Sequence, residues 1–132
     1  MPPAMVRKLL PLLVLALTGC AAGPETIQQA MASCARGASS VEVVASGTIA
    51  TLLGTYSSTT GQHEGFTLRS RAMTLRIEDN VNITGPIPLT KGEPVTLQGQ
   101  YECNDGVIHW THRDPRGRHI GGYIEAGGKI YR

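Results

Sequence analysis

Most of the side chains that could perform chemistry lie in one stretch, residues 106–123, which reads GVIHWTHRDPRGRHIGGY. It holds three of the four histidines, the only tryptophan and three of the arginines. A histidine can act as a general base or bind a metal ion, and an arginine binds anionic groups through charge-assisted hydrogen bonds. Three kinds of site are therefore open: a metal centre, a hydrolytic site and a binding patch.

The positions of these side chains depend on a turn predicted at residues 114–117, Asp-Pro-Arg-Gly, whose residue types fit a type I turn followed by a bulge. Such a turn joins two antiparallel strands, whose side chains alternate between two faces. One face then receives the predicted core residues Ile108, Trp110, Ile120 and Ile124. The other receives the predicted binding patch, which consists of His109, Thr111, Arg113, His119 and Tyr123, with Arg116 at the tip of the turn.

A metal centre does not fit this predicted geometry. His109 and His112 lie three residues apart, which on a strand places them on opposite faces. His109 and His119 share a face but are separated by roughly 13 Å along the strands, at ~3.3 Å per residue. The fourth histidine, His63, lies in a polar segment over residues 54–65 that predicts a solvated loop. We therefore expect no metal and no other cofactor.

A hydrolase or nuclease-type enzyme is the alternative function, with His109 or His119 as the general base and an arginine stabilising an anionic transition state. The predicted register turns Asp114 inward, so no carboxylate accompanies either histidine, and we assign no catalytic residue. A plain half-exposed polar face, with histidines bonded to their neighbours, is also open. The favoured function is a non-catalytic binding or interaction module for an anionic ligand, a glycan or a protein partner.

The chain begins with a predicted export signal. Two cations, Arg7 and Lys8, precede an apolar run over residues 9–17 that is too short to span a bilayer, which needs about 20 residues. The run ends in the sequence LTGC at residues 17–20, the pattern of a bacterial lipobox. We therefore expect residues 1–19 to be a lipoprotein signal peptide, with an ordinary secretory signal as the alternative.

Cleavage would leave Cys20 as the first mature residue, carrying the lipid that anchors the protein to a membrane, and residues 20–24 as a lipidated tether. Because Ala21 follows, where Asp usually retains lipoproteins in the inner membrane, we expect a bacterial cell-envelope protein on the periplasmic face of the outer membrane. Without Arg7 and Lys8, the basic and acidic residues balance. A domain with no net positive charge is not expected to bind nucleic acid.

The two other cysteines, Cys34 and Cys103, predict a disulfide, because the periplasm is oxidising. The bond would close a loop of about 70 residues and would stabilise the fold by about 4 kcal/mol in the chain-entropy model. Two buried free thiols are the alternative. A catalytic cysteine is not expected, since Arg36 is the only basic residue close to Cys34 in the sequence.

These sites need a framework, and the sequence predicts one that is mainly β. Residues 25–36 have apolar side chains at helical spacing and predict one N-terminal helix. Short alternating segments predict strands at 41–53, 66–71, 73–78, 95–103 and in the two arms of the hairpin. Their even spacing, and a proline-rich connection over 79–94, fit a small OB-like barrel. We expect residues 25–132 to form one OB-like β-barrel domain of short antiparallel strands.

The stretch GVIHWTHRDPRGRHIGGYI, followed by GKIYR, resembles the hallmark of a bacterial family of exported proteins, domain-of-unknown-function family 3465. The segments VEVVASGTIATLL and LTKGEPVTLQGQYE also lie where that family has equivalents. The resemblance implies an exported OB-like domain and brings no activity with it. Members of the family resemble one another in having Trp where this chain has Cys103, which, together with Cys34, favours a disulfide particular to this lineage.

Overall fold

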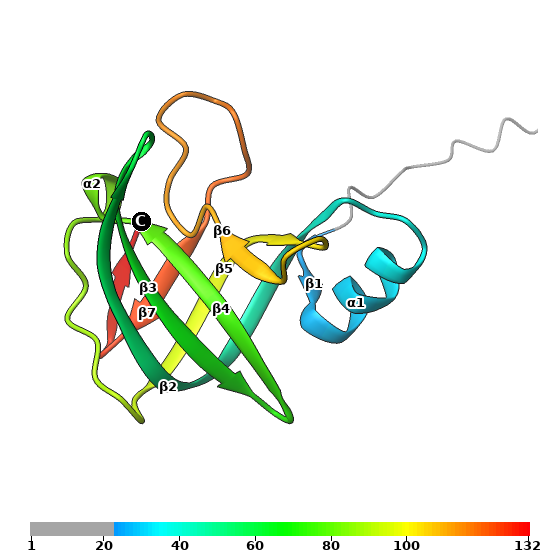
Figure 1. Cartoon of the computed structure of the whole chain (residues 1–132), viewed down its shortest axis with the longest axis horizontal. Coiled ribbons are helices and arrows are strands. Elements are labelled where there is room, and N and C mark those ends of the chain that lie inside the picture. The colour runs from blue at the N-terminus through cyan, green and yellow to red at the C-terminus, as the bar shows by residue number, and fades with distance from the viewer. Residues whose placement is uncertain (1–22) are drawn as a thin grey trace, which may run out of the picture.

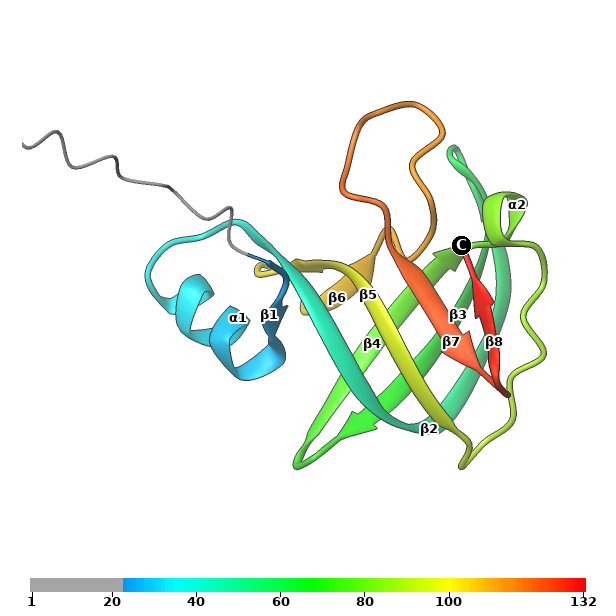
Figure 2. The same cartoon turned by 180° about the vertical axis from the view of Figure 1, so that it is seen from behind.

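The computed structural model describes residues 23–132 (Figure 1; Figure 2 gives the reverse view). The elements follow in the order β1 (Glu25–Thr26), α1 (Ile27–Ala35), β2 (Ser40–Ser58), β3 (Gly61–Ser70), β4 (Met73–Asn80), α2 (Val81–Thr84), β5 (Pro94–Glu102), β6 (Val107–His109), β7 (Tyr123–Ala126) and β8 (Lys129–Tyr131). The predicted signal peptide, residues 1–19, and the predicted lipidation site, Cys20, lie outside the described residues. None of the described helices is long and apolar enough to cross a membrane.

The strands form one sheet whose hydrogen bonds run around a closed ring. The first half of β2 pairs with β5 and its second half with β3. β3 pairs with β4, β4 pairs in parallel with β6, and β6 pairs with β5, which returns to β2. β1, β7 and β8 extend the sheet from β2 and β5. The prediction of a mainly β chain with an N-terminal helix is therefore confirmed, with a second, short helix (α2) added.

Gly47 lies at the point where β2 changes partner. It pairs with Val95 of β5, and a Cβ atom at this position would lie 2.1 Å from the carbonyl oxygen of Arg69 in β3. Only glycine permits so close an approach of two backbones. Two register shifts, at Ile49–Thr51 and Leu52–Gly54, bend the strand further. One long strand can therefore serve both halves of the ring, with its bend at Gly47.

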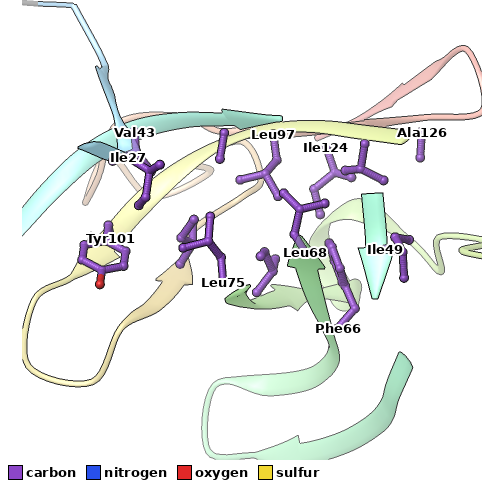
Figure 3. Close-up of a cluster of buried hydrophobic side chains, with 14 of the residues drawn as sticks. Ile27, Val43, Ile49, Phe66, Leu68, Leu75, Leu97, Tyr101, Ile124 and Ala126 are labelled. Atoms are coloured by element: carbon purple, nitrogen blue, oxygen red, sulfur yellow. The ribbon is translucent and has the colours of Figure 1, made fainter. Parts of the chain in front are cut away.

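The apolar core packs between the strands of the ring (Figure 3). Alternate residues of β3 and β4 face each other, with Phe66 opposite Ile77 and Leu68 opposite Leu75. All four side chains are buried. Burial of each such side chain contributes about 1.5–3 kcal/mol, which makes this period-two pattern the main force that fixes the register.

The helix α1 is joined to the sheet by the predicted disulfide, which is present. Cys34 of α1 and Cys103, which follows β5, have Cα atoms 5.5 Å apart and are 69 residues apart in the sequence. The helix begins at a capping box in which the side chain of Thr26 accepts a hydrogen bond from the backbone N–H of Gln29. Its buried residue Ile27 belongs to the core, so α1 is held by packing and by a covalent bond.

The predicted hairpin over residues 108–124 is wrong. β6 and β7 do not pair with each other, because both pair with the same edge of β5. β6 bonds to Gln100 and Tyr101, and β7 bonds to residues 95–98. The two arms therefore lie one after the other along β5. Residues 110–122, which we call the pocket loop, connect them without forming a ladder.

The side chains of this stretch follow the sheet rather than the hairpin. Ile108 and Ile124 are fully buried as predicted, whereas Trp110 is 38% exposed and Ile120 is 61% exposed. Thr111, predicted on the outer face, is buried. Both flanks of the turn pair with β5 instead of with each other, and Asp114 holds the loop between them. Its carboxylate accepts the backbone N–H groups of Arg116 at 3.0 Å and His119 at 2.7 Å.

Candidate functional site

A pocket of about 790 Å³ lies where β4 and β6 end. Three segments form it: the tip of the β2–β3 hairpin, the end of β4 with α2, and the first part of the pocket loop. Both views show the hairpin tip and the pocket loop rising side by side from this end of the ring (Figures 1 and 2). All four histidines of the chain line the pocket, namely His63, His109, His112 and His119.

The β2–β3 hairpin supplies one wall. The segment predicted as a loop, residues 54–65, consists mostly of paired strand, in which Tyr56 lies opposite His63. Their rings stack with centroids 5.3 Å apart and planes 16° apart. Nε2 of His63 is 2.9 Å from Oγ1 of Thr60, and its Nδ1 is buried without a hydrogen-bond partner among the described residues. Burial lowers the pKa of His63, so the neutral imidazole is favoured at neutral pH.

Glu78 and His109 come from neighbouring parallel strands. They follow Ile77 of β4 and Ile108 of β6, which are paired and buried, so both point to the opposite, outer face. Oε2 of Glu78 lies 3.6 Å from Nδ1 of His109, and Oε1 lies 2.8 Å from Nη2 of Arg76. Glu78 therefore lies between a guanidinium group and an imidazole ring.

Glu78 also acts on Tyr56 of the facing hairpin. Burial, followed by hydrogen bonding to Glu78 and its negative charge, raises the pKa of Tyr56 to about 12. The phenol therefore keeps its proton at every physiological pH. Tyr56 presents the pocket with a neutral aromatic ring rather than a charged one.

The pocket loop supplies the remaining wall, which begins with Trp110. Its backbone has φ of 57°, a left-handed conformation that costs about 1–2 kcal/mol for a residue other than glycine. The indole packs against His119, with ring centroids 4.5 Å apart, and His112 meets the same imidazole edge-on at 5.0 Å. Three aromatic rings are thus braced against one another beside the pocket.

The hydrogen bonds of His112 and His119 determine which nitrogen is available. Nδ1 of His112 lies 2.7 Å from the carbonyl oxygen of Arg113, and Nδ1 of His119 lies 2.7 Å from that of Ile120. A carbonyl only accepts, so Nδ1 of each ring is the donor. In the neutral form Nε2 of each ring is then a hydrogen-bond acceptor. Nε2 of His119 lies 3.8 Å from Oδ1 of Asp114.

Asp114 organises the pocket loop. Hydrogen bonds from the backbone N–H of His119, then those of Arg116 and Arg118, lower the pKa of the carboxyl group, although some burial opposes them. The carboxylate is therefore charged throughout the physiological range. Each of its oxygens accepts a backbone N–H, so the carboxylate holds the loop in shape while its negative charge stays in the pocket.

A third carboxylate, that of Asp79, supports the pocket without lining it. Asp79 of β4 is fully buried and accepts a hydrogen bond from Oγ1 of Thr111 at 2.7 Å and another from Thr84 of α2. Burial raises the pKa of Asp79, and the two hydroxyl donors oppose that rise. The contact joins the pocket loop to the floor formed by β4 and α2. Thr111, predicted to bind a ligand, is buried here and bonded to Asp79.

Comparison with known proteins gives a family. Residues 10–132 match the family described as protein of unknown function (DUF3465). The chain belongs to the DUF3465 family. This agrees with the resemblance carried by residues 106–123. No curated protein and no solved structure matches the chain.

The structure of this DUF3465 protein brings together only part of the predicted patch. His109, Arg116 and His119 line the pocket, whereas Arg113 and Tyr123 are not among its lining residues. Sequence reasoning missed the residues that β2, β3 and β4 supply, above all Tyr56, His63 and Glu78. The available signal was the short Ser-Ser-Thr-Thr-Gly turn at residues 57–61, which would have paired the two aromatic positions.

The histidines of the DUF3465 pocket do not converge on a metal site. Within residues 23–132, no group of three or more His, Cys, Asp or Glu side chains is close enough to hold a metal ion. Instead the rings pair with other rings and with single carboxylates. The pocket offers aromatic surfaces, hydrogen-bond acceptors and, at Arg116 and Arg118, cationic donors.

Proposed function

We propose that this DUF3465 protein is a non-catalytic binding module that takes an anionic or glycan-like ligand into the pocket lined by its histidines. One observation carries the proposal. The stretch 109–119 supplies three histidines, the only tryptophan and two arginines, and it lines one pocket together with His63 and Tyr56 of the distant β2–β3 hairpin. Concave sites of 300–1,000 Å³ with a few convergent polar groups are typical of small-molecule sites.

We further infer that the ring is a barrel of the OB type. Counted from β2, the ring has the order first, second, third, fifth, fourth, and its third and fifth strands are parallel. OB-folds bind oligonucleotides and oligosaccharides over their second and third strands and the loop between the first and second. In this chain these are β3, β4 and the β2–β3 tip, which supply His63 and Glu78 to the pocket.

The charges of the pocket favour a ligand with few negative charges. Arg116 and Arg118 are exposed and can donate to an anionic group. Glu78 and Asp114 place two carboxylates in the same pocket, and these would repel a polyanion. A nucleic acid strand, which carries a phosphate at every nucleotide, therefore fits less well than a ligand with a single acidic group.

We also propose that the protein acts in the cell envelope, as a lipoprotein anchored through Cys20 on the periplasmic face of the outer membrane. The lipobox sequence at residues 17–20 supports this location. The Cys34–Cys103 disulfide adds support, because such bonds persist in oxidising compartments. The intact mass of protein extracted from membranes, before and after reduction, measures both the acyl group and the cystine.

The binding proposal can be tested through the only tryptophan. Trp110 lines the pocket, so its fluorescence should respond to a bound ligand. We would titrate the protein with inorganic phosphate, neutral and acidic oligosaccharides and short peptides, with thermal shift as the second readout. At least one class should give a saturable change that the double variant Arg116→Ala/Arg118→Ala loses. The control Arg69→Ala removes an exposed arginine of β3 outside the pocket and should keep the response.

A hydrolase or nuclease-type enzyme is the second candidate, and one observation favours it. His109 has Glu78 at 3.6 Å and His119 has Asp114 at 3.8 Å, so each proposed base has a carboxylate that could orient it. The sequence alone supplied no such partner. Hydrolysis of bis(p-nitrophenyl) phosphate that survives a chelator and is lost in His109→Ala or His119→Ala would establish the enzyme. If the folded protein does not hydrolyse this substrate, the enzyme is rejected and the binding module remains the proposed function.

A further inference from the structure

The exposed indole of Trp110 indicates that the pocket binds a ligand that contains a ring. A bulky residue with positive φ is rare, and such strain persists where the position of the side chain matters. A glycine would fit this backbone without strain. Here a large indole borders the pocket, 38% exposed and braced by His119. An exposed aromatic surface of this kind suits stacking against a ring.

A second aromatic surface comes from another segment. Tyr56 of the β2–β3 hairpin is also 38% exposed, and its ring is held in place by stacking on His63. Both rings line the same pocket. The ligand therefore meets two fixed ring faces, which favours a molecule built from rings over a compact ion such as phosphate.

The hydrogen-bonding groups of the pocket distinguish sugars from phosphates. Nδ1 of His112 and of His119 donates to backbone carbonyls, so Nε2 is the nitrogen of each ring that faces a ligand and, when the ring is neutral, accepts a hydrogen bond. Glu78 accepts as well. A sugar ring carries many hydroxyl donors that can satisfy such acceptors, whereas an ionised phosphate has almost none. These acceptors favour a ligand that carries hydroxyl groups over an ionised phosphate.

The arginines add a requirement for one acidic group. Among the described residues, the ion pairs involve neither Arg116 nor Arg118. The nearest carboxylate in the loop, Asp114, is occupied by backbone N–H groups. Both guanidinium groups therefore remain able to bind a carboxylate from outside, with the paired geometry that arginine favours.

We propose that the pocket binds a sugar that carries a carboxylate, such as a uronic acid residue of an oligosaccharide. This inference rests on the proposed binding function and names the ligand class for the same pocket. The sugar ring stacks on Trp110, its hydroxyl groups donate to Glu78 and to the imidazole Nε2 atoms, and its carboxylate is bound by Arg116 and Arg118.

The test compares three probes on the full mature chain by calorimetry at pH 7.5. Maltotriose that carries one terminal galacturonic acid residue should bind about tenfold tighter than maltotetraose, since only the first has a carboxylate for the arginines, and inorganic phosphate should give no saturable heat. Galacturonic acid monomer, run in parallel, distinguishes a single-residue site from an oligosaccharide site. Equal affinity for the two oligosaccharides, or binding of phosphate alone, overturns the sugar-acid proposal. Phosphate binding would still leave the binding module intact.

Failure of the binding function itself would look different. It would appear as no response to any of these probes or to the wider panel by a protein that is demonstrably folded. The variant Trp110→Gly adds a test independent of misfolding, because glycine relieves the strained backbone. It should remain folded, as a cooperative thermal transition would show, yet bind the oligosaccharide with one galacturonic acid residue about tenfold more weakly. A folded Trp110→Gly variant with parental affinity overturns the proposal.

Discussion

The indole of Trp110 packs against the imidazole of His119, with ring centroids 4.5 Å apart and planes inclined by 37°. The two residues are nine positions apart and meet because Asp114 folds the loop between them. Its carboxylate accepts the backbone N–H of His119 at 2.7 Å. One turn residue thus determines where an aromatic surface of the pocket lies.

Replacement of Asp114 by Asn should loosen this arrangement without unfolding the protein. An amide has one accepting oxygen where the carboxylate has two, so one of the backbone donors loses its partner. We expect Trp110 to become more accessible, with a red-shifted emission maximum and stronger quenching by acrylamide. Asp105→Asn is the matched control. Asp105 also accepts a backbone N–H, from Val107, but it lies before β6 and outside the pocket loop that contains Trp110. Equal spectra for all three proteins would contradict this role of Asp114.

The sheet was more predictable from the sequence than the pocket was. Alternation over β3 and β4 predicts their pairing, because their apolar residues must share one buried face. The Asp-Pro-Arg-Gly turn gives no such information about its flanks. Whether the flanks pair with each other or with β5 depends on a strand that lies elsewhere in the chain. The residue types at 114–117 predict only the turn. Which strand β6 and β7 pair with depends on contacts with β5.

The sequence also did not predict that the β2–β3 hairpin forms a wall of the pocket. The tip of the hairpin extends beyond the core, and residues 51–60 are all exposed. No buried face exists there to impose alternation of apolar and polar residues, so the segment has the composition of a loop. The strands themselves therefore carried no alternation that placed Tyr56 opposite His63, and the turn at residues 57–61 was the one signal for that pairing.

Asp79 predicts a pH dependence of stability. Burial raises its pKa above the ordinary value of 3.8, so the folded protein binds more protons than the unfolded chain. The free energy of unfolding contributed by this group therefore falls as the pH rises from 3.8 through the folded-state pKa. Asp79→Asn should remove this slope and stabilise the protein at neutral pH. Urea unfolding of both proteins at pH 4 and pH 8 measures it, and parallel pH profiles would disprove the assignment.

Thr111 should matter for stability rather than for binding. Thr111→Val keeps the shape of the side chain but removes the donor to the buried Asp79, which is 2.7 Å away. We expect the free energy of unfolding to fall by about 1–3 kcal/mol, the cost of a buried polar group that loses its partner. Urea denaturation measures the change. Thr74→Val, on an exposed position of β4, is the control and should change little.

The Cys34–Cys103 disulfide should stabilise the fold without shaping the pocket. It closes a long loop between α1 and the end of β5, with a sequence separation of 69 residues. In the chain-entropy model, Cys34→Ser/Cys103→Ser lowers the free energy of unfolding by about 4 kcal/mol. Urea unfolding of the oxidised parent and the variant gives the difference. Emission from Trp110 in the folded variant should match the parent, and a shifted spectrum would show that the bond also positions the pocket loop.

Two adjacent glycines, Gly121 and Gly122, differ in the space available for a Cβ atom and so allow a matched comparison. A Cβ atom on Gly122 would lie 2.4 Å from the carbonyl oxygens of both Gln98 and Trp110, whereas one on Gly121 meets nothing closer than 3.8 Å. Gly122→Ala must therefore push the pocket loop away from β5, and we expect a loss of about 1–3 kcal/mol in the free energy of unfolding. The emission of Trp110 should shift, because its own carbonyl is displaced.

Gly121→Ala tests whether this effect is steric rather than a general cost of replacing glycine. It adds the same methyl group one position earlier, where there is space, so its stability and emission spectrum should match those of the parent. Both variants can be compared by urea denaturation and fluorescence in one experiment. If both are equally destabilised, the close approach at Gly122 does not hold the pocket loop. If only Gly122→Ala is affected, contact with β5 determines where Trp110 lies.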